Sequence, residues 1–323
     1  MRVFVPGGAG YVGSVLVPKL LALGHEVVVY DLYIYGRTLQ PHQRLTEIVG
    51  DVRDVAAFRA AVDGCDAVIH LACISNDPSC ELDPELARSI NYVSFVDQVA
   101  ACNEAGIKLF VYASSASVYG ISDAPEVTEE HPLKPISDYN RYKAKCERLL
   151  AHKARFDWVI VRPATTCGYS PRQRLDLVVN MFAAQAYFNR KITVLGGAQY
   201  RPVIHVNDIV ELYCGLLEVP VAEVSGQTFN ASCANMRVAE LAECTKADVE
   251  DLLGGNVALQ FRPSDDVRSY RVSNAKLLAL GFETTHDFYC GDLYAAFADG
   301  RIERDITSPT YVNIARMKQI GLR

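Results

Sequence analysis

The chain of 323 residues is half hydrophobic and 22% charged, a composition that buries a sizeable core in two lobes and argues against disorder. A net charge of −6 and a pI near 5.7 leave no broad basic surface for phosphate backbones, so we expect no nucleic-acid partner. The ten cysteines include no Cys-x-x-Cys pair and no Cys/His cluster at zinc spacing, so we expect free thiols and no metal.

The N-terminus bears on the location of the protein. A short β-rich segment is followed at once by glycines, which leaves no room for the apolar region of a signal peptide. No later apolar run approaches the length of a membrane span. We therefore expect a cytoplasmic protein without membrane contact.

Apolar β-rich segments alternate with amphipathic stretches through the first half of the chain. Strands are predicted at 2–5, 26–30, 46–50, 67–72, 108–114 and 157–162. This alternation predicts βαβ units and a parallel sheet. After Pro163 the rhythm loosens, and strands at 192–197, 227–232 and 257–262 stand among helices at 206–218 and 238–255. We expect one domain over 1–163 and a smaller α/β lobe over 164–323, some strands of which return to the first domain.

A glycine-rich loop follows the first predicted strand. Gly7, Gly10 and Gly13 have the spacing G-x-x-G-x-x-G, and a helix follows the loop. Small residues there allow a tight turn and the close approach of a pyrophosphate, whose charge the helix N-terminus attracts. The loop therefore predicts a dinucleotide site, to which Tyr11 and Val12 also belong.

The ends of the next strands carry further candidates for this site. Asp31 ends the second strand, where a carboxylate accepts both adenine-ribose hydroxyls and repels a 2′-phosphate, so NAD is favoured over NADP. Arg37 either softens this preference or is a surface charge. Asp51 and Val52 either border the adenine or are a solvated carboxylate and a core valine. Ala72, which is small, lets the cofactor pass over the sheet edge.

Polar residues that suit proton transfer follow the fifth strand. Ser114 and Ser115 end that strand, and Tyr139 and Lys143 form Tyr-x-x-x-Lys on a predicted helix. Residues four apart share one helix face, so the ammonium lies near the phenol. We expect this cation and a bound nicotinamide to lower the pKa of Tyr139 from about 10, which makes it a base near neutral pH.

Four segments, VPGGAGYVGS, ASSASVYG, YNRYK and RPVIHVNDIV, together resemble the nucleotide-sugar epimerase and dehydratase branch of the extended short-chain dehydrogenases, in particular the UDP-galactose 4-epimerases. The resemblance spans nearly the whole chain. It implies a Rossmann-type doubly wound parallel sheet with a smaller C-terminal α/β substrate lobe, and NAD as cofactor. It also implies that Ser115 orients a sugar hydroxyl, Tyr139 removes its proton and Lys143 holds the cofactor ribose. Ser114 and Pro163 then lie on the cofactor side.

The resemblance also limits the reactions that the chain is expected to catalyse. Dehydratases of this branch carry Asp-Glu directly after the catalytic threonine, where this chain has Ala116 and Ser117. Dehydration therefore lacks an acid and a base, and the additional acidic residue of the decarboxylases is absent too. A 4-epimerase is favoured, while a net 4-dehydrogenase or 4-ketoreductase and an idle dinucleotide sensor stay as alternatives. Relatives pair through long helices, here 90–105 and 140–152, so a homodimer is expected.

Family positions that hold the nucleotide diphosphate correspond to Asn180, Arg201 and Arg268, with Arg262 as a competing choice for the last. Guanidinium groups suit this task because they donate two hydrogen bonds at once and stay charged. Each arginine is alternatively a surface ion pair.

The sugar pocket departs from the family pattern. Thr165 stands where relatives often have asparagine, and Cys167 replaces a common tyrosine. Ser75 and Asn76 follow the fourth strand on the ligand side, where they contact the hexose or form a turn. His205 lies in an apolar strand and is expected to be a core histidine with satisfied hydrogen bonds.

Overall fold

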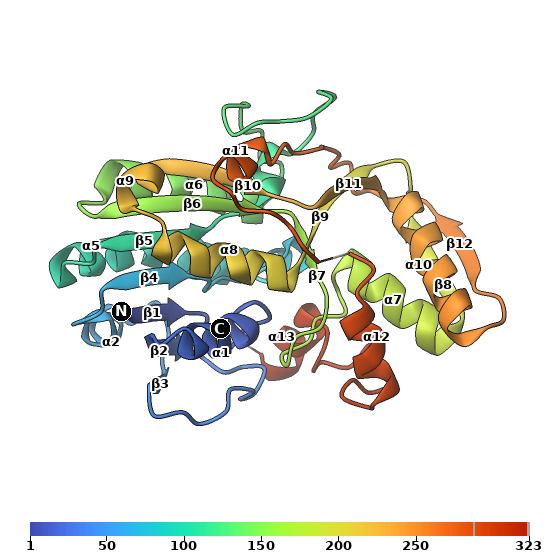
Figure 1. Cartoon of the computed structure of the whole chain (residues 1–323), viewed down its shortest axis with the longest axis horizontal. Coiled ribbons are helices and arrows are strands. Elements are labelled where there is room, and N and C mark those ends of the chain that lie inside the picture. Colours follow the sequence, from blue (N-terminus) through green and yellow to red (C-terminus); the bar gives the residue numbers. More distant parts are fainter. Residues whose placement is uncertain (287, 322–323) are drawn as a thin grey trace.

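A parallel sheet of seven strands forms the larger part of the molecule, and the computed structural model describes residues 1–286 and 288–321. All neighbouring strands of this sheet run parallel, as the alternating pattern predicts. Figure 1 shows the sheet stacked at one side of the molecule. From edge to edge the strands are β3 (Leu45–Val49), β2 (Glu26–Asp31), β1 (Arg2–Pro6), β4 (Ala67–His70), β5 (Leu109–Ala113), β6 (Asp157–Pro163) and β10 (Gln227–Ala231).

Helices cover both faces of this sheet, which is the doubly wound Rossmann arrangement. On one face α1 (Gly13–Ala22) and α8 (Val206–Glu218) pack against Val5, Val111 and Phe229. On the other face α2 (Val55–Val62), α5 (Ser94–Ala105) and α6 (Asp138–Lys153) pack against Phe4 and Phe110. Both faces of each central strand are therefore buried, which explains why these strands read as nearly continuous apolar runs.

One strand of the seven-stranded sheet and one helix that covers it come from the second half of the chain. The sequence pattern assigns 206–218 and 227–232 to a lobe some strands of which return to the first domain; α8 lies on the face of the large sheet, and β10 is a strand that extends its edge (Figure 1). Phe229 is 1% exposed, because parallel pairing of β10 with β6 places its ring in the core between the sheet and α8. Burial of this apolar ring explains why the strand returns to the sheet.

The second lobe has its own small core. Three strands, β11 (Ala234–Arg237), β9 (Tyr200–His205) and β7 (Thr165–Cys167), form one sheet, and β12 (Ala258–Arg262) pairs with β8 (Lys191–Leu195). The helices α7 (Val178–Asn189), α10 (Val238–Leu253) and α12 (Gly291–Ala298) enclose the apolar side chains between them. Strands β7 and β9 connect this lobe to the large sheet, so residues of both lobes line the region where they meet.

Short elements complete the chain: α3 (Asp77–Leu82), α4 (Pro84–Arg88), α9 (Val221–Val224), α11 (Ala275–Ala279) and α13 (Asn313–Ile320). Figure 1 shows α13, in red, at the junction between the large sheet and the second lobe. Among the helices of residues 1–286 and 288–321, none has the length and apolar character that crossing a membrane requires.

A buried ion pair joins β6 to α6. The Arg162 guanidinium contacts Glu147 at 2.7 Å, and the side chains are 7% and 6% exposed. Arg162 also donates to the Tyr119 hydroxyl at 2.8 Å. The two charges are thus removed from water and compensate each other, an arrangement in which loss of one partner is costly.

We expect Glu147→Ala to lower the free energy of unfolding by about 3–5 kcal/mol, because it leaves the Arg162 charge buried without its partner. Glu104→Ala is the matched control, since Glu104 pairs with Arg59 at the surface and contributes about 0–1 kcal/mol. Urea denaturation followed by circular dichroism measures both. Equal effects of the two substitutions would show that burial does not strengthen the Glu147 contribution.

Candidate active site

The glycine-rich loop passes so close to the sheet edge that side chains are excluded. Gly7 has φ +82°, and a Cβ there would lie 2.5 Å from the backbone nitrogen of Ala72 at the end of β4. A Cβ on Gly13 would lie 2.4 Å from the Gly8 carbonyl oxygen. Helix α1 begins at Gly13 with no side-chain cap and no acidic residue in its first turn. Its N-terminal N–H groups therefore suit a phosphate, and the loop fits the predicted dinucleotide.

Asp31 lies directly against this loop. Its carboxylate accepts hydrogen bonds from the backbone N–H groups of Ala9 at 3.0 Å and Tyr33 at 2.9 Å. Burial raises the pKa of Asp31, while these backbone hydrogen bonds lower it. Arg37 is half exposed and pairs with Glu47 at 3.1 Å, which is the surface alternative for this residue.

The other cofactor-site candidates differ in burial and in their contacts. Val52 is buried, and the Asp51 carboxylate is bound by Arg53 at 2.6 Å. Tyr11 and Val12 stand just before α1, and the Tyr11 ring is buried. Pro163 ends β6 at the same sheet edge. These positions all lie at the carboxyl ends of parallel strands, where ligands of this fold bind.

The three residues expected to carry the chemistry converge at that edge. Lys143 donates to the Ala113 carbonyl at 2.5 Å, and its nitrogen is 5.9 Å from the centre of the Tyr139 ring. Ser115 is 2.7 Å from the Ser117 hydroxyl, which in turn donates to Asn140. The hydroxyl of Ser115 is thereby linked to the residue next to Tyr139, on the first turn of α6.

The expected lowering of the Tyr139 pKa is wrong for the protein alone. Burial raises the pKa of this phenol well above its usual value, and Cys73 and Asp77 add to the increase. The opposing cation is Arg174, and the Lys143 ammonium is engaged by the Ala113 carbonyl. Desolvation disfavours the phenolate more than the surrounding side chains favour it.

Ser114 does not turn toward the cleft. Its hydroxyl donates to Glu147, and the side chain is buried. Glu147 is the carboxylate that pairs with Arg162. The side chain of Ser114 therefore belongs to the structural network between β6 and α6, although its backbone still lies at the end of β5.

Arg201 and Arg268 lie side by side in the second lobe. Asp266 binds both guanidinium groups, at 2.7 Å each. Arg268 also donates to Asp77 at the start of α3, next to Asn76. Arg262, the competing choice, is exposed on β12. The structure thus brings Arg201 and Arg268 together near the junction of the lobes. Arg262 is not part of this group.

The side chain of Asn180 bonds to protein groups. It accepts from the Gly168 N–H at 2.9 Å and donates to the Tyr11 hydroxyl at 3.1 Å and the Arg174 carbonyl at 2.9 Å. Tyr11 in turn donates to the Gly168 carbonyl at 2.8 Å. Two residues that the sequence assigns to different ligands therefore bond to each other and connect the lobes.

Ser75 and Asn76 join the loop between β7 and α7. Arg174 donates to the Ser75 hydroxyl at 3.2 Å, and Asn76 donates to Asp176 at 3.1 Å. Asn76 also caps α3 by accepting from the N–H of Ser79. Thr165, on β7, is partly exposed.

A polar group that was not predicted from the sequence consists of Arg172, Arg174 and Asp176 from this loop and Asn313 from α13. Arg174 pairs with Asp176 at 2.8 Å, and Asn313 bonds to Arg172 and Asp176. The available signal was a charged residue at every second position of the segment PRQRLD. Asn313 lies 137 residues from Asp176, so no local pattern relates them.

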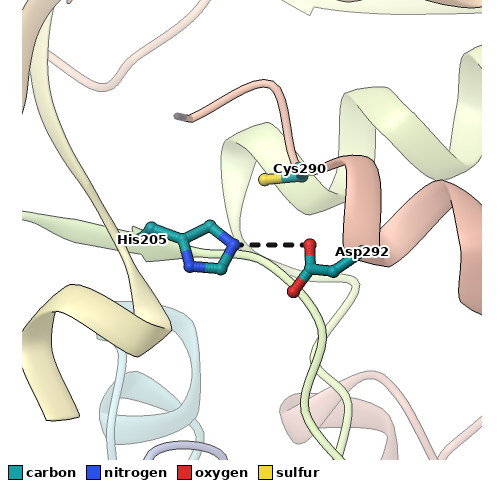
Figure 2. A group of neighbouring side chains, drawn as sticks. All are labelled: His205, Cys290 and Asp292. Atoms are coloured by element: carbon teal, nitrogen blue, oxygen red, sulfur yellow. Dashed lines mark hydrogen bonds and ion pairs between the residues drawn. The ribbon is translucent and has the colours of Figure 1, made fainter. Parts of the chain in front are cut away.

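A second polar cluster brings together residues with metal-binding side chains. Figure 2 shows His205, Cys290 and Asp292 facing one another, with ligand atoms within 4.8 Å. The Nδ1 atom of His205 accepts from the Asn207 N–H at 3.2 Å. This pattern places the proton on Nε2, which donates to Asp292 at 3.3 Å. A metal needs the Nε2 lone pair, so this geometry favours a satisfied core histidine.

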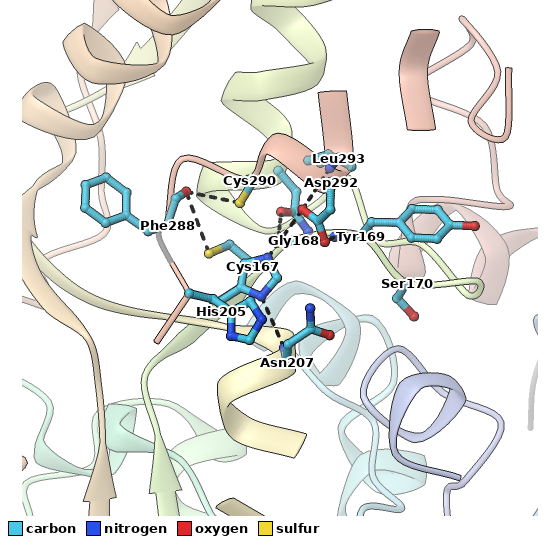
Figure 3. A network of polar contacts seen from close by, with 12 residues as sticks. Cys167, Gly168, Tyr169, Ser170, His205, Asn207, Phe288, Cys290, Asp292 and Leu293 are labelled. Carbon is cyan, nitrogen blue, oxygen red and sulfur yellow. Dashed lines mark hydrogen bonds and ion pairs between the residues drawn. The ribbon is translucent and has the colours of Figure 1, made fainter. Parts of the chain in front are cut away.

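The rest of this cluster fits a structural role. Asp292 also accepts from the N–H groups of Tyr169 and Leu293, and Figure 3 shows both contacts. Cys290 donates to the Phe288 carbonyl at 3.0 Å, and buried Cys167 faces the same oxygen at 4.0 Å. Cys167, the last residue of β7, therefore packs against the segment that precedes α12. The cluster fixes the loop that begins at Gly168.

Comparisons with known proteins identify a family and relatives that match most of the chain. The model of the NAD dependent epimerase/dehydratase family matches residues 3–232. UDP-glucose 4-epimerase of Lactobacillus helveticus is 26% identical over 279 residues, 79% of this chain and 84% of the relative. UDP-glucuronic acid decarboxylase 1 of Xenopus tropicalis is 28% identical over 298 residues, 87% of this chain and 68% of the relative.

Solved structures agree on the fold. The UDP-glucose 4-epimerase of Thermus thermophilus in complex with NAD has a TM-score of 0.82 at 24% identity, and the match covers 94% of this chain and all of that one. The dTDP-glucose 4,6-dehydratase DesIV of Streptomyces venezuelae, with NAD bound, has a TM-score of 0.82 at 23% identity and covers 93% and 98%. The relatives thus share the architecture and differ in the reaction.

We expect Gly7→Ala to destabilise the protein by more than Gly36→Ala. Both glycines have positive φ, +82° and +90°, so both substitutions carry the strain of about 1–2 kcal/mol for a left-handed residue. Only at Gly7 does the new methyl group meet backbone, because nothing lies within 4 Å of a Cβ on Gly36. Thermal unfolding of the two variants tests this, and equal losses would refute the close approach of Gly7 to Ala72.

Proposed function

Since the chain belongs to the NAD dependent epimerase/dehydratase family, we propose that it is a nucleotide-sugar 4-epimerase that acts through a transient 4-keto sugar. Membership of this family makes it an NAD-dependent enzyme. One observation carries the choice of reaction: Tyr139, Lys143 and Ser115 lie at the carboxyl edge of the sheet that also carries the glycine-rich loop, without a second acid–base pair after Ser115.

Each of the three residues has a task in this reaction. The Tyr139 phenolate removes the proton of the sugar 4-hydroxyl, and Ser115 orients that hydroxyl by a hydrogen bond. Lys143, whose nitrogen lies 5.9 Å from the centre of the Tyr139 ring, holds the cofactor ribose, and Arg174 is the cation that favours the ionised phenol. NAD, when bound, would supply the hydride acceptor for oxidation of the carbinol carbon and the hydride donor for its reduction.

Two reactions found among relatives are disfavoured by the residues after Ser115. Ala116 and Ser117 are buried, and the Ser117 hydroxyl is engaged by Asn140. Loss of water requires an acid and a base near the sugar carbon that loses them. Neither residue supplies these groups, which supports hydride transfer at a carbinol carbon as the whole reaction.

Arg201 and Arg268 are proposed to hold the substrate diphosphate. They lie together at the junction of the lobes, and Arg268 reaches Asp77 at the start of α3. Two adjacent guanidinium groups suit two linked phosphates. Two relatives named above bear UDP in their names, so UDP-hexoses are the first substrates to test.

The ten cysteines, all free thiols, support a reducing compartment such as the cytoplasm.

The first experiment identifies the reaction. The purified protein is denatured to release and identify its nucleotide, and intact protein is incubated with UDP-glucose and UDP-galactose. Interconversion without accumulated NADH is the expected result. Stoichiometric keto-sugar and NADH would contradict the epimerase in favour of a net 4-dehydrogenase, and bound NAD without turnover of any sugar nucleotide would favour a sensor.

We expect Tyr139→Phe to reduce kcat by about 100- to 10,000-fold, the range of a lost general base, while NAD stays bound. Tyr142→Phe is the control, because Tyr142 lies on the same helix with its ring stacked on Tyr92. Turnover of a sugar nucleotide and the NAD content per chain are measured for both variants. Full activity of the Tyr139 variant would remove this residue from the mechanism.

We further propose a homodimer through α5 and α6. Val93, just before the start of α5, and Val96, in its first turn, are 41% and 44% exposed. The neighbouring face carries the stacked rings of Tyr92 and Tyr142. A second copy of this surface would cover both valines.

Val96→Glu is expected to convert the dimer to a monomer, since it places a charge at the centre of the paired surface. Leu252→Glu serves as control, because Leu252 is 54% exposed on α10 in the other lobe. Light scattering after gel filtration gives the mass of each variant. A monomeric unsubstituted protein, or a dimeric Val96 variant, would refute this interface.

A further inference from the structure

Arg172 is a buried cation without a carboxylate partner. Its side chain lies in the loop between β7 and α7, and the residue is 4% exposed. Within residues 1–286 and 288–321, no carboxylate lies at ion-pair distance from it, and its Nε–H has no hydrogen-bond acceptor. Burial and the neighbouring Arg174 lower the pKa of the guanidinium to about 10. Such a group is costly to bury unless a counter-charge joins it.

The contacts of Arg172 place it between the two ends of the candidate cofactor site. Its backbone N–H donates to the Ser14 hydroxyl at 3.3 Å, in the first turn of α1. Its guanidinium lies 3.5 Å from the centre of the Tyr35 ring, four residues beyond Asp31. Asp31 also acts electrostatically on it. A dinucleotide that runs from Asp31 to the N-terminus of α1 passes through this interval.

We propose that Arg172 binds the diphosphate of the NAD molecule and that Asn313, from helix α13, positions it. A diphosphate supplies the missing negative charge and acceptor oxygens that match the fork of N–H donors. The proposal rests on NAD binding and not on the direction of the sugar reaction. The same chemistry is present in the diphosphate of a nucleotide sugar, but the contacts with Ser14 and Tyr35 favour the cofactor.

Helix α13 fixes this arginine from the far end of the chain. The Asn313 side chain accepts from Arg172 at 2.5 Å and donates to Ser75 at 3.2 Å, and its backbone N–H donates to Asp176. Arg316, one turn on, donates to the Ile34 carbonyl at 2.6 Å in the loop that follows β2. Figure 1 shows α13 at the junction of the lobes, where these loops meet. Asn313 is therefore a positioning residue.

The test compares ligands that share adenosine and differ in phosphate. Full-length Arg172→Gln, freed of nucleotide, is titrated with ADP-ribose and with adenosine, and Kd is measured by calorimetry. We expect ADP-ribose to bind roughly 10- to 100-fold more weakly, as for loss of a charge-assisted hydrogen bond, and adenosine to be unaffected. Arg59→Gln, which removes an exposed arginine on α2, is the charge-matched control and should change neither Kd.

Three outcomes would overturn the proposal. Equal weakening of ADP-ribose and adenosine would show that Arg172 only holds the fold. Unchanged binding of ADP-ribose would remove it from the cofactor site. In a parallel titration with UDP, weaker UDP binding together with unchanged ADP-ribose binding would assign the guanidinium to the substrate diphosphate. None of these readouts requires turnover, so they stand apart from the epimerase proposal.

Asn313 has a separate test. We expect Asn313→Ala to weaken ADP-ribose in the same phosphate-dependent way but by a smaller factor, because Arg172 keeps its charge and loses one contact. Asn313→Gln, which keeps an uncharged amide oxygen as acceptor, should retain more of the affinity than Asn313→Ala. An alanine variant with unchanged affinity would show that α13 does not position Arg172.

Discussion

The arrangement of the candidate active site depends on a buried group of hydrogen bonds between the lobes, those that join Tyr11, Gly168 and Asn180. Tyr11 belongs to the glycine-rich loop, and the other two residues belong to the second lobe. Because all three groups are shielded from water, breaking any of these bonds leaves a buried polar group unsatisfied, which opposes any opening of the lobes at this point. The loop that carries Arg172 and Arg174 begins directly after this contact, and its position therefore follows from it.

The features that the sequence predicted are those with local causes. Alternating apolar segments identified the parallel sheet, glycine spacing identified the turn before α1, and the four-residue spacing of Tyr139 and Lys143 placed both on one helix face. Features fixed by distant partners were not accessible. Ser114 turns to a glutamate 33 residues away, and Asn180 bonds to a tyrosine 169 residues away. The return of β10 to the large sheet likewise depends on a core that no local pattern describes.

Tyr139 shows how two physical effects compete at one site. Spacing along a helix correctly placed Lys143 near the phenol, but burial raises the pKa of the hydroxyl, and the cation that opposes this increase is Arg174. Sequence conveys which charges are near, whereas desolvation depends on everything packed around the ring, including Cys73 and Cys80. In the proposed mechanism the positive charge of oxidised NAD would favour the Tyr139 phenolate, which would couple the proton chemistry of this residue to the oxidation state of the cofactor.

The return of β10 also has a consequence for biosynthesis. As the chain leaves the ribosome, residues 1–163 can pair six strands, but β6 remains an open edge until residues 227–231 arrive. An unpaired edge strand with Val159 and Val161 is a template for association with other nascent chains. The intervening segment, which builds β7, β8 and β9, must therefore be translated while this edge is unprotected. Slow synthesis over that interval prolongs the exposure of the edge and favours aggregation.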